Sequence, residues 1–151
     1  MNNSIWGPLE LHLNDHAQLL VAEKAAFPNS WDATRLIQVM FTPVPRKKVF
    51  AYCTDASSIV GYIGLDTDDC GDAYINNLGV IPQFRNQGLG EKLVKHAVNI
   101  AAVHKRKRVW LHVAADNMSA IKLYFKLGFR ITGFLKDYAG RDQDVLTMTK
   151  E

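Results

Sequence analysis

Apolar residues recur along the chain with two spacings, and the spacing separates predicted helices from predicted strands. A first helix is predicted after the capping residues Asn14 and Asp15, because apolar residues then follow every three or four positions until Pro28. These apolar residues are Leu19, Ala22, Ala26 and Phe27.

Three further helices have the same periodicity. They are predicted over 31–41, over 91–103 and from Asp116 or Asn117 through Leu127. Asp32 can cap the start of the first of these, which ends before Pro43, and Gly128 ends the last one in the usual position after a helix.

Strands are predicted where apolar and polar residues alternate or where short apolar runs lie between turn residues. They cover 9–13, 48–54, 59–66, 73–81, 108–115, 129–135 and 144–150. Within 108–115, the odd-numbered residues from Val109 to Val113 are predicted to share one face and the even-numbered residues from Trp110 to Ala114 the other. About seven strands and four helices in mixed order predict the α/β class.

Composition narrows the class of protein further. The 151 residues, 48% of them hydrophobic and 22% charged, fit one globular domain over 1–151. A net charge of +3 suits an anionic ligand but is well short of a dedicated nucleic-acid binder.

Several features of the sequence indicate a cytoplasmic protein. The N-terminus lacks the pattern of a signal peptide, and no apolar run is long enough to span a bilayer, so no membrane partner is expected. Cys53 and Cys70 are expected to be free thiols. The acidic loop 66–72 lacks the spacing of a calcium loop, so no metal site is predicted.

Two glycines lie where a predicted strand gives way to a helix, in the stretch RNQGLG (85–90). Glycine permits close backbone approach, and a helix N-terminus presents unpaired N–H groups that suit an anion, which predicts a phosphate-binding loop. A Walker loop needs Gly-Lys-Ser/Thr, and the dinucleotide fingerprint needs three glycines and an acidic residue after the next strand, so neither fits. The glycine pair alone is equally compatible with a simple turn.

The wider pattern is more specific than the glycines. Strand, Arg-x-x-Gly-x-Gly, helix and strand are followed by Asn-x-x-Ala-x-x-x-Tyr and Leu-Gly-Phe. This order resembles the GNAT superfamily of acetyl-CoA-dependent N-acetyltransferases over nearly the whole chain, most sharply from Tyr74 to Phe129. The stretch DNMSAIKLYFKLGF (116–129) resembles the family's second motif. The resemblance implies the GNAT fold, a mixed central sheet with a splayed central strand pair.

The resemblance also implies acetyl-CoA as co-substrate and a set of residues that bind it. Backbone amides would hold the pyrophosphate, a strand would pair with the pantetheine arm, and second-motif residues would line the arm's other side. These residues are, in the same order, Arg85, Asn86, Gln87, Gly88, Leu89, Gly90 and Glu91; Leu78, Gly79 and Val80; and Asn117, Ser119 and Tyr124. Gly79 is expected to form the bulge that splays this strand from the next. Asn117 can equally be a plain helix cap.

Acetyl transfer to an amine needs a base, a donor to the developing oxyanion and an acid for the departing thiolate. The resemblance implies Tyr124 as the acid and the backbone N–H of Val80 as the donor. His112 stands where many relatives, including ribosomal-protein alanine acetyltransferases, carry Glu. With Tyr74 it resembles instead the tyrosine and histidine pair by which other protein N-terminal acetyltransferases act on the amine through water. Tyr124 and His112 can also be purely structural residues.

The acceptor amine is harder to predict. AAFPNSW (25–31) resembles the substrate loop of protein N-terminal acetyltransferases, so Phe27, Pro28 and Trp31 are expected to contact the acceptor, with Tyr138 opposite. All four can instead be packing and turn residues. An α-amine has a pKa near 8, against about 10.4 for lysine, and gives up its proton more readily to a modest base. A protein or peptide α-amine is therefore favoured, followed by a small-molecule amine such as a polyamine, an amino acid or an antibiotic.

Other classes remain as alternatives. A non-catalytic acyl-CoA-binding regulatory domain can share the fold, although the joint presence of Tyr74, His112 and Tyr124 argues against it. The basic stretch HKRKR (104–108) is predicted to be a solvated helix end and not a nucleic-acid patch. The expected partners are acetyl-CoA and the acceptor, for a monomer or a homodimer.

Overall fold

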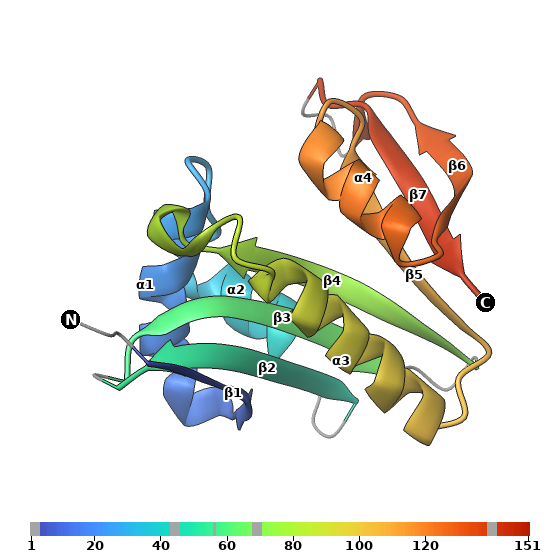
Figure 1. The fold of residues 1–151 in the computed structure, drawn as a ribbon. Helices are drawn as coiled ribbons and strands as arrows, with labels where there is room; N and C mark the ends of the chain where they lie inside the picture. Colours follow the sequence, from blue (N-terminus) through green and yellow to red (C-terminus); the bar gives the residue numbers. More distant parts are fainter. Residues whose placement is uncertain (1–3, 43–45, 56, 68–70, 139–141) are drawn as a thin grey trace.

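The protein is built around one seven-stranded sheet, shown in Figure 1 as a computed structural model that describes residues 4–42, 46–55, 57–67, 71–138 and 142–151. The strand order is β1-β2-β3-β4-β5-β7-β6. The strands are β1 (Ile5–Leu11), β2 (Lys47–Thr54), β3 (Ile59–Thr67), β4 (Asp72–Val80), β5 (Arg108–Ala114), β6 (Arg130–Leu135) and β7 (Val145–Lys150). All neighbouring strands are antiparallel except β4 and β5, which are parallel. The predicted mixed sheet is confirmed.

Helices cover both faces of the sheet. They are α1 (His16–Ala26), α2 (Ala33–Met40), α3 (Leu89–Val103) and α4 (Met118–Lys126), with short 3-10 turns at Leu13–Asp15 and Pro82–Phe84. Apolar residues of α1 and α2 form one buried cluster with the sheet, and those of α3 and α4 form another on the opposite face. β3 is buried along its whole length because both clusters cover it.

The first strand differs from its prediction. It was expected over 9–13 but runs from Ile5 to Leu11, and Leu13–Asp15 is a 3-10 turn. Gly7 and Pro8 disfavour strand structure, and the register with β2 shifts between Trp6 and Leu9 to accommodate them. This is possible because β1 is an edge strand, where proline leaves no ladder bond unmade.

Two helix boundaries also differ from the prediction. α1 ends at Ala26, so Phe27 is extended and stands outside the helix. α3 starts at Leu89, and Gly88 at its N-cap is in the left-handed region with φ +81°. Gly90 therefore belongs to the first turn of the helix. The N-cap of α2 agrees with its prediction, because Asp32 accepts a hydrogen bond from Arg35 N.

The predicted bulge at Gly79 is wrong. Gly79 pairs in register with Tyr62 of β3, and the register shift in β4 falls at Asn76, between the pairs Gly64–Asn77 and Leu65–Ile75. Gly79 is needed for another reason, since a Cβ there would overlap the ring and hydroxyl of Tyr62. A bulge at Asn76 places two consecutive side chains, Asn76 and Asn77, on the face covered by α1 and α2.

The predicted splay is present. β4 and β5 pair only from Asp72–Arg108 to Ile75–Leu111, and beyond this point no pairing continues between them. Figure 1 shows the two strands side by side at the start of β4 and diverging toward its end. The bulge at Asn76 begins where the pairing stops, which accounts for the change in strand direction.

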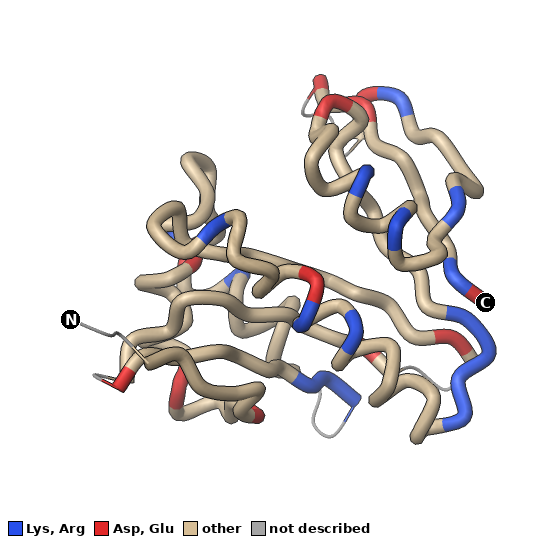
Figure 2. Tube along the Cα trace, viewed as in Figure 1, with Lys and Arg blue, Asp and Glu red and all other residues tan. Residues whose placement is uncertain are grey.

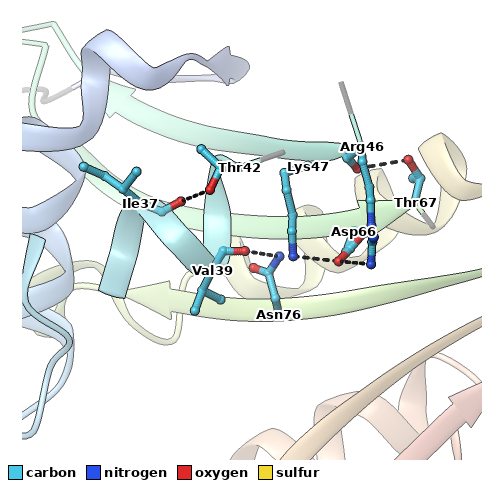
Figure 3. A network of polar contacts seen from close by, with 8 residues as sticks. All are labelled: Ile37, Val39, Thr42, Arg46, Lys47, Asp66, Thr67 and Asn76. Atoms are coloured by element: carbon cyan, nitrogen blue, oxygen red, sulfur yellow. Dashed lines mark hydrogen bonds and ion pairs between the residues drawn. The ribbon is translucent and has the colours of Figure 1, made fainter. Parts of the chain in front are cut away.

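Charged residues are spread unevenly along the chain (Figure 2). The basic stretch 104–108 forms the exposed turn between α3 and β5, and its Arg108 is paired with Asp72 at 3.2 Å. A second charged group, shown in Figure 3, surrounds the buried carboxylate of Asp66, which accepts hydrogen bonds from Arg46 Nε at 2.5 Å and Lys47 Nζ at 2.6 Å. It ties the start of β2 to the end of β3. Neither group lies at the start of α3, where the phosphate loop is predicted.

The prediction of two free thiols can be compared with the structure only at Cys53. Cys53 is free and buried, and burial followed by the charge of Asp15 raises the pKa of its thiol. Cys70 lies outside the described residues.

Candidate active site

The splayed strands enclose a cleft of about 280 Å³. Its lining comes from β4, β5, α4 and the segment after α1: Phe27, Tyr74, Ile75, Asn76, Asn77, Leu78, Leu111, His112, Val113, Ala114, Asn117, Ala120 and Tyr124. Tyr124 belongs to the core on the α3–α4 face, whereas Asn77 and Phe27 contact the α1–α2 face. The opening thus connects the two faces of the sheet. Six of the predicted site residues line it.

The backbone of β4 offers free groups to this cleft. Ile81 N donates to Val60 O at 3.0 Å, and hydrogen-bonding partners alternate along an antiparallel ladder. The N–H groups of Val80 and Leu78 therefore point away from β3, toward the opening. The N–H of Gly79 instead faces β3, and neither Gly79 nor Val80 has a side chain in the lining of the cleft.

The loop before α3 presents a row of unpaired amides. Within the described part of the chain, the N–H groups of residues 86–91 have no backbone acceptor. Asn86 and Gly88 are both in the left-handed region, with φ values of 62° and 81°, which turns successive amides to one side. The helix dipole adds positive potential at the same point. These residues fit a pyrophosphate group.

Two of the predicted loop residues, Arg85 and Glu91, have other roles as well. The Arg85 side chain donates to Val80 O at 2.9 Å and to Ala26 O at 2.8 Å, and its own amide donates to Pro82 O. Arg85 therefore joins β4 to α1 and is not a free phosphate donor. A Cβ on Gly90 would meet Leu123 at an ordinary 3.5 Å, so the packing of α3 against α4 does not require glycine at this position.

The Glu91 side chain faces lysines. It is paired with Lys126 at 3.2 Å and Lys95 at 3.4 Å, and hydrogen bonds from these two lysines lower the pKa of its carboxyl. Only the Glu91 backbone amide remains available to an anion. A larger cavity of about 460 Å³ between α3 and the end of α4 contains Lys95 and Lys126 but no predicted site residue.

Tyr124 and Asn117 line the cleft from α4. Tyr124 is 5% exposed, and burial raises the pKa of its hydroxyl to about 12. The hydroxyl is therefore protonated at neutral pH and can donate. Asn117 caps α4 by accepting from Ala120 N at 3.3 Å, so its structural role is present together with its place in the lining. Ser119 is exposed on the first turn of α4 and is not part of the lining.

An aromatic cluster lies on the other face of the opening. Tyr74 stacks on Trp110 with ring centroids 4.2 Å apart, and the His112 ring lies 5.9 Å from Tyr74 and 5.3 Å from Trp110. Tyr138 is 5.2 Å from His112. The predicted pair Tyr74 and His112 is thus brought together, with Tyr138 beside it. Trp110 was not among the predicted site residues, although its alternation with His112 on β5 was a signal for it.

The surroundings of His112 favour its neutral state. Burial lowers the pKa of its imidazole below the usual 6.5. Its Nδ1 lies 3.2 Å from Thr147 Oγ1 of β7, which leaves Nε2 without a hydrogen bond within the described chain. If Nδ1 carries the proton and donates to Thr147, Nε2 is the free base. No sequence signal pointed to Thr147. Burial also raises the pKa of the Tyr74 hydroxyl to about 12.

A second cavity, of about 320 Å³, contains the predicted acceptor loop. It is lined by Glu23, Phe27, Pro28, Asn29, Trp31 and Asn77. Phe27, Pro28 and Trp31 are brought together as predicted, whereas Glu23 and Asn77 were missed. Glu23 is 3% exposed and lies in the last turn of α1. Phe27 and Asn77 line this cavity and the cleft, so the two spaces adjoin.

The described residues include no cluster of three or more His, Cys, Asp or Glu side chains placed to hold a metal ion. None of the described helices is long and apolar enough to cross a membrane.

The known proteins that resemble this chain in sequence are named as acetyltransferases. The mycothiol acetyltransferase of Corynebacterium efficiens is 33% identical over 107 residues, which are 67% of this chain and 34% of that protein. A putative [ribosomal protein bS18]-alanine N-acetyltransferase of Bacillus subtilis is 36% identical over 78 residues, 51% of this chain and 52% of the relative. The matched parts thus span between a third and about half of the length of these two relatives.

Solved structures share the fold over nearly the whole chain. The ribosomal-protein-S18-alanine N-acetyltransferase of Escherichia coli superposes with a TM-score of 0.85 at 22% identity and covers 97% of this chain and 92% of its own. Arabidopsis thaliana Naa50, in complex with the bisubstrate analogue CoA-Ac-MVNAL, gives 0.78 at 25% identity and covers 98% and 97%. The model of the acetyltransferase (GNAT) family matches residues 16–129. Since this match covers well over half of the chain, the protein belongs to the acetyltransferase (GNAT) family.

Proposed function

We propose that this protein transfers the acetyl group of acetyl-CoA to a primary amine, and that the amine is the α-amine of a protein or peptide. One observation carries the proposal. The opening between β4 and β5 has Tyr124 on one face of the sheet and Tyr74 with His112 on the other. A thiol leaving group and an attacking amine can therefore meet in one cleft from opposite sides.

The residues can be given roles on chemical grounds. Acetyl-CoA supplies an activated acyl thioester. The amides of 86–91 bind its pyrophosphate, and the strand edge at Leu78 and Val80 orients the arm, with Val80 N–H directed at the thioester oxygen.

Proton transfer accompanies the exchange of bonds. His112 Nε2 accepts the proton of the amine through water, and Tyr74 helps to hold that water. The new N–C bond forms as the C–S bond breaks. Tyr124 then donates its hydroxyl proton to the thiolate sulfur. Burial favours the neutral form of His112 and keeps Tyr124 protonated at pH 7, which are the states that these roles require.

The choice of a peptide α-amine rests on the cavity beside the cleft. Phe27, Pro28 and Trp31 form an apolar and aromatic wall next to the aromatic cluster, which suits the first side chain of a peptide. An α-amine also matches a neutral histidine better than lysine does, because its pKa is near 8. The Bacillus subtilis relative is named for a ribosomal-protein alanine, and the Arabidopsis structure holds the analogue CoA-Ac-MVNAL, so both support a protein or peptide acceptor.

A small-molecule amine is the second candidate. The relative named as a mycothiol acetyltransferase covers two thirds of this chain, and the cavity of about 320 Å³ is of a size for a compact amine.

The test is a screen of acceptors with acetyl-CoA, read by thiol release and by mass spectrometry of the products. The acceptors are peptides with each of the twenty first residues, the same peptides with a blocked α-amine and a free lysine, polyamines, amino acids and aminosugars. We expect a mass gain of one acetyl group on unblocked peptides only. Acetylation of the small amines alone would select the second candidate, and tight acetyl-CoA binding without any transfer would leave a non-catalytic domain.

A further inference from the structure

Glu23 connects the acceptor loop to the splayed strand. Its Oε1 accepts hydrogen bonds from Tyr62 Oη at 2.5 Å and from Asn77 Nδ2 at 2.9 Å, and its Oε2 accepts from Trp31 N at 3.2 Å. The three donors come from β3, β4 and the loop between α1 and α2. One buried carboxylate therefore ties together the elements that form the acceptor cavity.

This contact determines the orientation of the Asn77 side chain. A carboxylate can only accept hydrogen bonds, so the carboxamide must turn its NH₂ group toward Glu23 and its Oδ1 away from it. Within the described chain, Asn77 Oδ1 has no hydrogen bond. It remains an acceptor at a residue that lines both the cleft and the acceptor cavity.

Resting on the proposed function, we propose that Asn77 Oδ1 accepts a hydrogen bond from the attacking amine, and that Glu23 is the positioning residue that holds the carboxamide in this orientation. The location fits, because Phe27 and Asn77 are the two residues shared by the two spaces and the amine must pass between them. The chemistry also fits, because a neutral amide oxygen orients an N–H without stabilising the ammonium form as a carboxylate would. The lone pair of the amine is then left for attack.

A purely structural role for Glu23 makes a different prediction. As a simple tie between elements, its loss would lower stability and affect acetyl-CoA and acceptor alike. As a positioning residue, its replacement acts on the KM of the acceptor alone. Three variants separate these two readings.

Glu23→Gln reverses the direction of the hydrogen bond between position 23 and Asn77. The Trp31 N–H is a fixed donor, so the Gln oxygen must face it and the Gln NH₂ must face Tyr62 and Asn77. The Tyr62 hydroxyl can accept instead of donate. Asn77 then rotates to accept from Gln, which leaves its NH₂ group facing the cavity. We expect the KM for the acceptor to rise by about tenfold or more, with kcat and the KM for acetyl-CoA changed less than about threefold.

A second variant restores the hydrogen-bonding pattern. In Glu23→Gln with Asn77→Asp, the Gln NH₂ donates to one carboxylate oxygen of the Asp side chain, and the other oxygen faces the cavity as an acceptor. We expect the KM to return to within about threefold of wild type. The limb of the pH profile that belongs to the amine moves to higher pH, because the carboxylate favours the protonated amine.

Asn77→Leu removes the acceptor and keeps the branching of the side chain, and Glu10→Gln on exposed β1 removes a carboxylate elsewhere as a control. In ¹⁵N-labelled protein, the Asn77 side-chain amide signal reports the bond to Glu23 without any need for turnover. We expect the KM for the acceptor to rise by about tenfold or more in Asn77→Leu and to stay unchanged in Glu10→Gln. In Glu23→Gln we expect the amide signal of Asn77 to shift.

The outcomes are distinct. An active wild type whose KM is unchanged by Asn77→Leu overturns the inference and leaves the proposed function intact. A KM rise in Glu23→Gln that the second substitution does not reverse overturns the role of Glu23. A wild type that binds acetyl-CoA but acetylates no amine overturns the proposed function and this inference together.

Discussion

Replacement of His112 by alanine tests the proposed chemistry most directly. The imidazole is partly buried beside Trp110 and Tyr138, and this burial holds its pKa below 6.5. The lowered pKa therefore favours the neutral base at pH 7. Loss of a general base lowers the rate by about 10²–10⁴, which is about 2.7–5.5 kcal/mol of transition-state free energy.

The pH profile gives the sign of the effect. Because the base must be neutral, kcat/KM rises with pH through the lowered pKa of His112. A second rise near pH 8 belongs to the α-amine of the acceptor. The assay is thiol release over pH 5–9 with an acceptor peptide. We expect His112→Ala to lose the lower limb and keep the upper one.

Controls separate the base from general damage. His104→Ala removes an exposed histidine at the end of α3 and should leave both limbs unchanged. Tyr74→Phe should add little in the His112→Ala background, because both residues act on the same step. A variant of His112 that keeps the lower limb, or that loses less than tenfold in rate, would refute the assignment and make His112 a structural residue.

Three further substitutions have expected outcomes. Gly88→Glu places a side chain in open space at φ +81°, a strained conformation that costs about 1–2 kcal/mol without a clash. We expect a folded protein of lower Tm that acetyl-CoA no longer stabilises, because the added charge repels pyrophosphate. An unchanged acetyl-CoA-induced shift in Tm contradicts the phosphate loop. Tyr124→Phe should lower kcat by about a hundredfold with little change in acetyl-CoA affinity, and intact turnover would make Tyr124 a packing residue. Burial raises the pKa of Asp66, but hydrogen bonds from Arg46 and Lys47 outweigh this effect and hold the pKa below its usual value. The ionised Asp66 therefore stabilises the fold above about pH 4, and this stabilisation is lost as the pH falls through the lowered pKa. Asp66→Asn should therefore cost about 1.5–3 kcal/mol at pH 7, measured by chemical unfolding, and the difference from wild type should shrink in acid; equal losses at both pH values would contradict it.

The sequence predicted the parts of the fold that depend on local pattern. The helical spacing before Pro28, the cap at Asp32 and the alternation around His112 are properties of short segments, and the structure agrees with them within a few residues. The first strand was missed in part because local preference at Gly7 and Pro8 argues against a strand, whereas pairing with β2 overrides it. The order of motifs also indicated the family.

The cleft could be predicted only by resemblance, and its detail depended on contacts between distant segments. The place of the bulge is decided by the fit of β4 against β3, where Gly79 lies over Tyr62 and the extra residue falls at Asn76. Because side chains alternate along a strand, this single residue decides that Asn77 faces α1.

The sequence by itself therefore determined the elements, their order and the glycine loop, since these follow from periodicity and backbone freedom over a few residues. Only the tertiary structure decided which side chains meet. Glu23 contacts Tyr62 from 39 residues away, and Thr147 reaches His112 from 35 residues away. No short-range pattern encodes such pairs, because they depend on how the sheet brings together strands that are far apart in the chain.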